Sequence, residues 1–248
     1  MGFLGMAPGE NRHMDLADRD GLVQTDCRRY EDGSFRDFTD MVALEAQVKL
    51  HWPGLDQKEL WAFPQGLDLL ALGHALLEFC APGQVPVLDK RQGNDFLLSP
   101  GPNPPPALSQ AEIRLEAEAV AARMAEFISE GGRWDKTGCF HRAGLFDPER
   151  GVFVFMAEDV GRHNCLDRMA GWCLGQGVSA HGLLLFISAR ATASLTAKAA
   201  RAGFRAVVSR SAVTEASISL AEASGLTLIG FARESRFTVF TDRQGLMA

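Results

Sequence analysis

The stretch Leu183-Leu184-Leu185-Phe186-Ile187-Ser188-Ala189-Arg190 joins a short apolar run directly to a turn that carries an arginine. Three more segments in the second half of the chain have the same form, and their turns carry Arg162, Arg210 and Arg233. Runs this short and this apolar are typical of strands that are buried on both faces of a helix-covered parallel sheet. Ligands of such sheets bind beyond the carboxyl ends of the strands. The pattern therefore predicts a pocket for an anion, and for a phosphorylated one in particular, at one edge of a sheet.

The composition limits the kind of protein this is. With 248 residues, of which 46% are hydrophobic, the chain has enough apolar material for one large core, or for a main domain with a smaller companion. The formal net charge of −6 argues against a nucleic-acid binder with a broad basic face. No apolar stretch reaches the roughly 18 residues that span a bilayer, and the N-terminus lacks the apolar core of a signal peptide. We therefore expect a cytoplasmic protein that binds neither nucleic acid nor membrane.

Four regions differ in their patterns. Residues 1–38 are polar, charged and aperiodic, and we expect a loosely ordered lead-in. Residues 39–98 combine strand-like alternation with an apolar helix over residues 67–79, which predicts a small α+β domain. Residues 99–108 form a proline-rich linker that suits neither a helix nor an inner strand. Residues 109–248 alternate apolar runs with helical segments, which predicts an α/β domain with a mainly parallel sheet.

The α/β domain has further expected boundaries. Ser109-Gln110-Ala111-Glu112 is a capping box that starts a helix with the apolar stripe Ile113, Ala117, Val120, Met124 and Phe127. Later helices are expected near residues 139–146, 163–175, 192–202 and 214–224, and a final strand near residues 236–240.

The turn Glu158-Asp159-Val160-Gly161-Arg162-His163-Asn164 gathers acids, an arginine, an imidazole and an amide between a strand and a helix. His163 and Asp167 are four residues apart, so they share a helix face on which the aspartate can orient the ring. A capped helix end with solvated charges is the plain alternative. The density of functional groups favours a binding or catalytic site.

Thr137-Gly138-Cys139-Phe140-His141 places a cysteine at a predicted helix start and near a histidine. Helix amides and a nearby imidazole both favour a thiolate, although a buried small thiol beside a satisfied histidine is the alternative. Zinc deamination needs a His/Cys-x-Glu pair and a Pro-Cys-x-x-Cys pair, and the sequence has neither, so no metal site is expected. The five cysteines are odd in number and irregular in spacing, which predicts reduced thiols.

The other turns combine hydroxyl groups with guanidinium groups, whose planar fork suits phosphate. Taken singly, each of these arginines is expected to be a solvated surface residue. Their repetition at four strand ends is what indicates a binding site. We expect Lys198 to be an exposed helix lysine.

Together these segments resemble the formate dehydrogenase accessory sulfurtransferase family (FdhD/NarQ). The similarity covers roughly residues 40–90 and 130–242, and its most specific string is Glu-Asp-Val-Gly-Arg-His at residues 158–163. The other matching pieces are Thr137-Gly138-Cys139 with His141, Asp167, Ser188-Ala189-Arg190-Ala191, Lys198, Ser211-Ala212 with Thr214, residues 226–231 and residues 236–239.

The resemblance implies a cytidine-deaminase-like α/β fold without zinc, usually in a homodimer. Such proteins take sulfur from a cysteine desulfurase as a persulfide. They pass it to the molybdenum (or tungsten) bis-molybdopterin guanine dinucleotide cofactor before that cofactor enters formate dehydrogenase. GDP is then a mimic of the bound ligand, and guanine nucleotides would account for an arginine-rich sheet edge.

The resemblance also implies site residues. The family's cofactor-contacting stretch falls on Phe231, Ala232, Arg233, Glu234, Ser235 and Arg236. We add Arg162, His163, Arg190 and Arg210 as contacts to phosphate or guanine, and His141 and Asp159 as residues that organise the site.

The chain departs from the family pattern at one place. Members usually carry a Cys-Gly-x-Cys loop ahead of the long helix, and one of its thiols bears the persulfide. Here residues 99–108 occupy that place and contain no cysteine. Two hypotheses remain open: Cys139 carries the sulfur, or the protein is a non-catalytic cofactor chaperone or scaffold. A zinc hydrolase is a weaker third.

Overall fold

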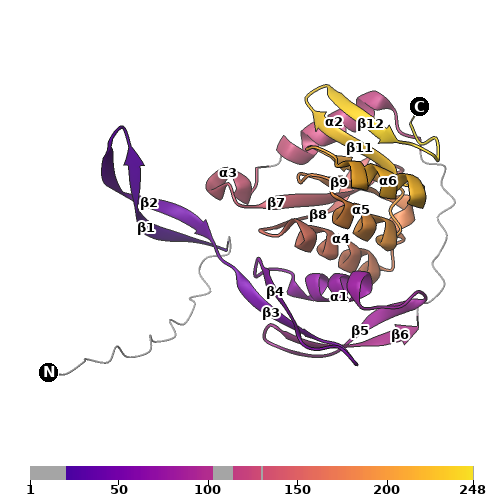
Figure 1. The fold of residues 1–248 in the computed structure, drawn as a ribbon, viewed down its shortest axis with the longest axis horizontal. Helices are drawn as coiled ribbons and strands as arrows, with labels where there is room; N and C mark the ends of the chain where they lie inside the picture. Colours follow the sequence, from indigo (N-terminus) through magenta and orange to yellow (C-terminus); the bar gives the residue numbers. More distant parts are fainter. Residues whose placement is uncertain (1–20, 103–113, 130, 248) are drawn as a thin grey trace.

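The computed structural model describes residues 21–102, 114–129 and 131–247, and Figure 1 shows how its elements are arranged. In chain order these are β1 (Leu22–Glu31), β2 (Ser34–Ala43), β3 (Ala46–His51), β4 (Lys58–Ala62), α1 (Leu67–Glu78), β5 (Gln84–Gln92), β6 (Asp95–Pro102), α2 (Ala117–Ser129), α3 (Arg133–Thr137), β7 (His141–Asp147), β8 (Val152–Asp159), α4 (Arg162–Gln176), η1 (Ala180–Gly182), β9 (Leu184–Ile187), α5 (Ala193–Ala202), β10 (Ala206–Ser209), α6 (Glu215–Ser224), β11 (Thr227–Arg233) and β12 (Arg236–Thr241). The described strands form a two-stranded hairpin, a four-stranded sheet and a six-stranded sheet. The fold is mixed α/β, which agrees with the class expected from the sequence.

The six-stranded sheet has the strand order β12-β11-β10-β9-β7-β8. The β9–β10 and β10–β11 pairings are parallel. In contrast, β7 pairs antiparallel with both β8 and β9, and β12 pairs antiparallel with β11. The expectation of a mainly parallel sheet is therefore wrong. The cause is the two hairpins, β7–β8 and β11–β12, because strands joined by a tight turn pair antiparallel.

The segment 139–146, expected to be a helix, is mostly strand β7. Residues 143–146 are buried because β7 lies inside the sheet, between β8 and β9. An apolar run this short gives the same signal in a buried strand and in a buried helix. The helices expected near residues 163–175, 192–202 and 214–224 are confirmed as α4, α5 and α6, and the final strand is β12. None of the described helices has the length and apolar character needed to cross a membrane.

Strand direction brings the four arginine turns together. Because β7 is antiparallel to both of its neighbours, β8 points the same way as β9, β10 and β11. The carboxyl ends of these four strands therefore lie along one edge of the sheet, where β7 begins. We call this edge, with Arg162, Arg190, Arg210 and Arg233 in its turns, the arginine edge.

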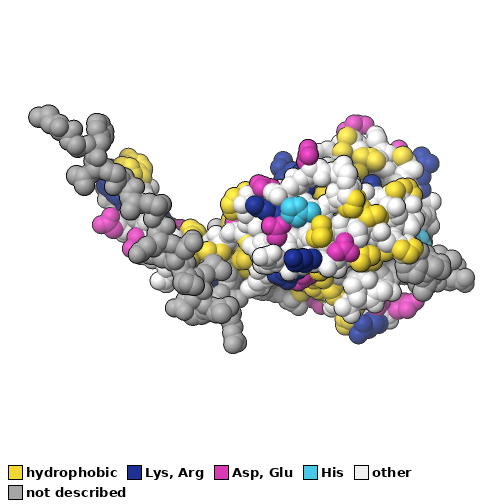
Figure 2. All heavy atoms as spheres, turned by 90° about the horizontal axis from the view of Figure 1, so that it is seen from below, with side chains coloured by type: hydrophobic (Ala, Val, Ile, Leu, Met, Phe, Trp, Pro, Cys, Tyr) yellow, Lys and Arg dark blue, Asp and Glu magenta, His cyan; other side chains and the backbone are white. Residues whose placement is uncertain are grey.

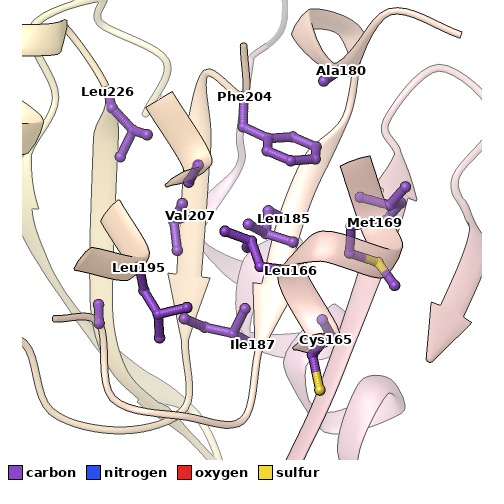
Figure 3. Packing of buried hydrophobic residues seen from close by; sticks show 14 of the residues in the cluster. Cys165, Leu166, Met169, Ala180, Leu185, Ile187, Leu195, Phe204, Val207 and Leu226 are labelled. Carbon is purple, nitrogen blue, oxygen red and sulfur yellow. The ribbon is translucent and has the colours of Figure 1, made fainter. Parts of the chain in front are cut away.

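Two apolar clusters cover the two faces of the six-stranded sheet. On one face α4, α5 and α6 pack against the strands, and Figure 3 shows Leu166 of α4 beside Ile187 of β9. On the other face α2 contributes Val120, Met124 and Phe127, which are all buried, as the predicted apolar stripe requires. The sheet is thus a layer between helices, while the cytidine-deaminase-like layering in particular stays an expectation from the family.

A second, smaller sheet has the order β4-β3-β6-β5, and α1 packs against one of its faces. The strand-like alternation of this region is interrupted near its start, because β2 ends at Ala43 and β3 begins at Ala46. Residues 99–102 of the expected linker belong to β6, where they pair with β5 alone among the described strands, an edge position that tolerates proline. The rest of the linker and the expected capping box at residues 109–112 lie outside the described residues, and the domain boundaries stay predictions.

The hairpin of β1 and β2 projects away from the body of the molecule (Figure 1, Figure 2). Over residues 22–38 the expectation of a loosely ordered lead-in is therefore wrong. The overlooked signal is Asp32-Gly33, a pair typical of two-residue hairpin turns, in which both residues have positive φ angles of 52° and 82°. Residues 1–20 lie outside the described part.

The helices α1 and α4 join the two parts of the molecule, and they touch backbone to backbone. A Cβ atom on Gly171 of α4 would lie 2.0 Å from the carbonyl oxygen of Leu69, and one on Gly73 of α1 would lie 1.6 Å from the carbonyl oxygen of Asp167. Both helices therefore need glycine where they cross.

We predict that Gly171→Ala destabilises the protein by about 1–3 kcal/mol, because the added methyl group forces the two helices apart. Gly175→Ala on the same helix is the matched control, since nothing lies within 4 Å of the added atom. There the higher helix propensity of alanine should add about 0.5–1 kcal/mol of stability. Urea unfolding of both variants measures the difference, and equal stabilities would contradict the helix contact.

Candidate functional site

The turns of the arginine edge hold one another in place. The backbone amide of Arg142 donates to the hydroxyl of Ser188 at 2.9 Å. The amide of Arg210 donates to the carbonyl of Ile187 at 3.0 Å. The Nε of Arg233 donates to the carbonyl of Arg210, also at 3.0 Å. The turns after β9, β10 and β11 therefore lie side by side.

The guanidinium groups at this edge are exposed and lack acidic partners. Within the described ranges, no carboxylate forms an ion pair with Arg162, Arg190, Arg210, Arg233 or Arg236. Other arginines of the same domain are neutralised, as in the pairs Arg142–Glu158 and Arg168–Asp159. The edge therefore offers positive charge to an anion from outside the chain.

Two helices begin at the same edge without a side-chain cap. The N-cap residues are Gly161 for α4 and Thr192 for α5, and neither side chain accepts a hydrogen bond from the first turn. The free amides of such a helix end attract anions. The helix ends and the arginines thus favour the same kind of ligand.

His141 lies at the start of β7, opposite Asp159 across the β7–β8 pairing. Burial lowers the pKa of this histidine below its ordinary value. The positive charges of Arg162 and Arg190 lower the pKa further, and Asp159 acts in the opposite direction. The ring is therefore kept neutral beside the arginines, and a bound anion would favour its protonation.

His163 does not pair with Asp167, contrary to expectation. Its Nε2 lies 3.4 Å from the hydroxyl of Ser194, while the Asp167 carboxylate binds His74 at 2.9 Å and Lys198 at 2.7 Å. Lys198 is buried by this ion pair, so the expectation of an exposed lysine is wrong. Burial lowers the pKa of His163, and the charges of Lys198 and Arg162 lower it further.

Asp159 is fully buried, and its carboxylate is already occupied. It accepts hydrogen bonds from two nitrogens of Arg168, at 2.6 and 3.0 Å, and from the side-chain amide of Asn164 at 2.8 Å. The backbone amides of Gly161 and Phe63 also donate to it. The structure thus places Asp159 behind the edge, where it positions the turn and the start of α4.

Cys139 is exposed and lies two residues before His141. It follows the C-terminal end of α3, whose C-cap is Gly138, so the expectation that it starts a helix is wrong. Cys139 therefore lies at a helix end that presents carbonyl groups and no free amides. Within the described chain, no three His, Cys, Asp or Glu side chains gather closely enough to hold a metal ion.

Three of the remaining four cysteines are buried, and one is exposed. Burial raises the pKa of the thiols of Cys80 and Cys165, and raises that of Cys173 to about 12. These three thiols are protonated at neutral pH. Cys27, on strand β1, is the exposed thiol besides Cys139. The sequence had not singled it out.

The end of β11, the turn after it and the start of β12 carry the residues that match the family's cofactor stretch. Phe231 and Glu234 hold left-handed backbone angles, with φ of 52° and 53°, a conformation that costs free energy outside glycine. Phe231 is 42% exposed, and Arg233, Glu234, Ser235 and Arg236 are also exposed, whereas Ala232 is buried in the core. The side chain of Ala232 therefore faces away from any ligand at this turn.

Two hollows flank this part of the edge. The first, of about 250 Å³, is lined by residues that include Trp134, Asp135, Phe140, His141, Ser188 and Arg210, and we call it the Trp134 pocket. The second, of about 240 Å³, is lined by Phe231, Arg236, Phe237 and Thr238, and we call it the Phe231 pocket.

Several residues of the site region were not found from the sequence. Arg168 and His74 make the buried contacts described above, and Arg142 pairs with Glu158 of the expected turn beside the Trp134 pocket. A signal existed for Arg168, because a charged residue within the apolar run of α4 needs a buried partner. His74 gave no such signal, since its partner is 93 residues away.

A model of the FdhD/NarQ family matches residues 91–247, which is more than half of the chain. The chain belongs to the FdhD/NarQ family. The resemblance seen in the sequence is therefore confirmed, and the matched region contains the whole arginine edge.

Similar proteins extend this result. A sulfur carrier protein FdhD of Bacillus subtilis is 38% identical over 131 residues, which are 53% of this chain and 49% of that protein. A protein FdhD of Methanocaldococcus jannaschii is 29% identical over 221 residues, which are 89% of this chain and 96% of its own. A crystal structure assigned to a formate dehydrogenase accessory protein of Desulfotalea psychrophila has a TM-score of 0.75 at 20% identity, and covers 91% of this chain and 99% of that one. The last comparison shows that the fold is shared.

We predict that Arg162→Ala and Arg190→Ala each raise the pKa of His141 towards its ordinary value, because each removes a charge that opposes protonation. NMR titration of the histidine ring protons measures the shift, with His141→Gln for assignment. Arg150→Ala is the control, since this exposed arginine lies in the β7–β8 turn at the opposite edge. An unchanged pKa in both edge variants would contradict the geometry.

The same shift has a consequence for stability. A histidine with a lowered pKa in the folded chain contributes stability above its ordinary pKa of about 6.5, and this contribution is lost as the pH falls below that value. The His141→Gln variant should therefore lose less stability than the wild type as the pH falls, because the contribution of this ring is absent.

Proposed function

We propose that this FdhD/NarQ family member is a sulfur carrier that serves the maturation of formate dehydrogenase. We further propose that it binds the molybdenum bis-molybdopterin guanine dinucleotide cofactor, as its client, at the arginine edge. The names of its relatives support the first part. One observation carries the second: several exposed arginines from separate turns lie at one sheet edge, and the described residues offer them no carboxylate.

The chemistry of a nucleotide diphosphate fits this edge. Each guanidinium group can donate two hydrogen bonds to a phosphate, and charge-assisted bonds of this kind are stronger than neutral ones. The side chain of Arg233 donates to the backbone carbonyl of Arg210, so the two turns can bind neighbouring phosphate groups. The uncapped start of α5 adds backbone amides on the face of the sheet that α4, α5 and α6 cover. His163 and Arg162 begin α4 beside it.

Cys139 is our candidate for the sulfur carrier. Its thiolate would attack the terminal sulfur of a persulfide on a cysteine desulfurase. The donor's S–S bond breaks, a new S–S bond forms on Cys139, and the donor cysteine leaves as a thiolate, so no further oxidant or reductant is needed. The exposure of Cys139, two residues before His141 at the start of β7, supports this role. From the family we also expect a cytoplasmic homodimer.

A second function, that of a non-catalytic cofactor chaperone, is favoured by the missing cysteine loop. Residues 99–108 contain no thiol. Such a protein would bind the same client at the same edge but would carry no sulfur.

We predict that Arg162→Ala or Arg233→Ala weakens GDP binding by about 1.5–3 kcal/mol for each lost charge-assisted contact. Isothermal titration calorimetry measures the change. Arg150→Ala, which removes an equal charge at the opposite edge, should bind GDP as the wild type does. Unchanged affinity in both edge variants would remove the basis for placing the nucleotide here.

Sulfur transfer has a separate test. We predict that incubation with a cysteine desulfurase and ³⁵S-labelled cysteine puts a persulfide on Cys139, as detected by mass spectrometry. The label should be absent from Cys139→Ala and retained in Cys27→Ala, the matched variant of the other exposed thiol. Binding of GDP without any label on the wild type would favour the chaperone, and label on Cys27 would refute the role of Cys139.

A further inference from the structure

We propose that the free edge of β8 binds an extended, acidic segment of a partner protein, which adds to the six-stranded sheet as a further strand. This binding surface is independent of the nucleotide site. Among the described strands β8 pairs with β7 alone, so it ends the sheet. Residues 153–158 of β8 are half-buried, whereas β9 and β10 inside the sheet are buried along their whole length. The described residues therefore leave this edge open.

The sequence of β8 does not protect its edge. Residues 152–157 read Val-Phe-Val-Phe-Met-Ala, with no charge and no proline. Natural edge strands are normally protected by lysine, proline or a bulge, because their free amides and carbonyls can pair with another chain. The one irregularity in the β7–β8 pairing lies between Leu145 and Phe146, and residues 155–158 of β8 pair regularly with β7 beyond it. This half of the strand is a regular, unprotected edge.

The pairing with β7 shows which backbone groups of β8 face outward. The amide of Arg142 donates to the hydroxyl of Ser188, and the carbonyl of Arg142 accepts from the amide of Ser188. The backbone of Arg142 therefore faces the end of β9 and turns away from its partner on β8, Glu158. Because bonded and non-bonded pairs alternate along an antiparallel ladder, Glu158 and Met156 direct their amides and carbonyls to the free side. An added strand would bind these groups.

A hollow of about 340 Å³ lies against this half of β8, and we call it the β8 groove. It is lined by residues 155–158, by residues of the segment 63–69 and by Gly131 and Arg133. The segment 63–69 leads into α1, which packs on α4 on one face of the sheet, and Gly131 follows α2 on the other face. The groove is therefore bounded from both faces, and its width suits one extended chain better than a second helix-covered sheet.

The charge of the β8 groove favours an acidic occupant. The guanidinium groups of Arg133, Arg142 and Arg168 line it, and Glu158 is the one acid among the described residues of its lining. Glu158 pairs with Arg133 and Arg142, and Asp159, behind the groove, pairs with Arg168. Three positive charges thus meet two negative ones. A second copy of β8 would bring the same excess of positive charge, so an acidic segment of another protein fits better.

Phage display of random heptapeptides on the immobilised protein tests the proposal, and fluorescence anisotropy then measures how the enriched peptides bind in solution. We expect enriched sequences with at least one aspartate or glutamate and without a central proline. Met156→Pro removes an outward-facing amide, a change that an edge strand tolerates. It should weaken peptide binding about tenfold, because a backbone hydrogen bond is lost and the proline ring obstructs the added strand. Met156→Leu, which keeps both the amide and an apolar side chain, is the matched control and should bind as the wild type does.

The role of charge has its own variant. Arg133→Gln keeps a hydrogen-bond donor but removes a positive charge. It should weaken binding of the acidic peptide and leave unchanged the binding of the same peptide with its acids replaced by their amides. Circular dichroism and thermal unfolding check that each variant is folded, and Arg133→Gln decides the test if Met156→Pro is not.

Three results would overturn the proposal. The first is that no peptide is enriched over a blank surface, and the second is that folded Met156→Pro and Arg133→Gln both bind the enriched peptides as the wild type does. The third is a wild-type dimer in sedimentation velocity that Met156→Pro converts to a monomer, because the edge would then belong to a second copy of the chain. None of these results bears on nucleotide binding at the arginine edge.

Discussion

The buried pair of Asp159 and Arg168 is the contact on which the functional edge depends. Their side chains are 0% and 3% exposed, and the closest oxygen and nitrogen are 2.6 Å apart. Arg168 also donates to the carbonyls of Phe63, Gln65 and Gly66, which precede α1. Breaking such a pair costs about 3–5 kcal/mol, since the remaining charge stays buried without a partner. The end of β8, the start of α4 and the segment before α1 are therefore fixed together.

This constraint explains how an acidic chain keeps a positively charged surface. Three acids near the edge are paired inside the protein: Asp159 binds Arg168, Asp167 binds His74 and Lys198, and Glu158 binds Arg142 and Arg133. The edge arginines are left to face solvent. Burial and two of these arginines lower the pKa of His141, as expected for a histidine beside a positively charged surface. A bound diphosphate would supply the negative charge that the described residues do not offer to these arginines.

Much of the α/β domain could be predicted, because its short apolar runs and helical stripes are local signals. The antiparallel insertion of β7 could not, since a seven-residue buried strand and a buried helix turn look alike in sequence. We predicted that the arginine turns lie at one edge of the sheet. This holds although the sheet is mixed, because β8, β9, β10 and β11 all run in the same direction. The partners of Asp159 and Asp167 were missed. Their contacts with Phe63 and His74 join residues 96 and 93 positions apart, which no local pattern encodes.

We propose that guanidinium groups from separate turns bind one nucleotide diphosphate. A crystal structure of the protein with GDP tests it most directly. We expect phosphate oxygens within hydrogen-bond distance of Arg210 and Arg233, at the carboxyl ends of β10 and β11. GDP bound away from this edge, with these side chains still free, would contradict it.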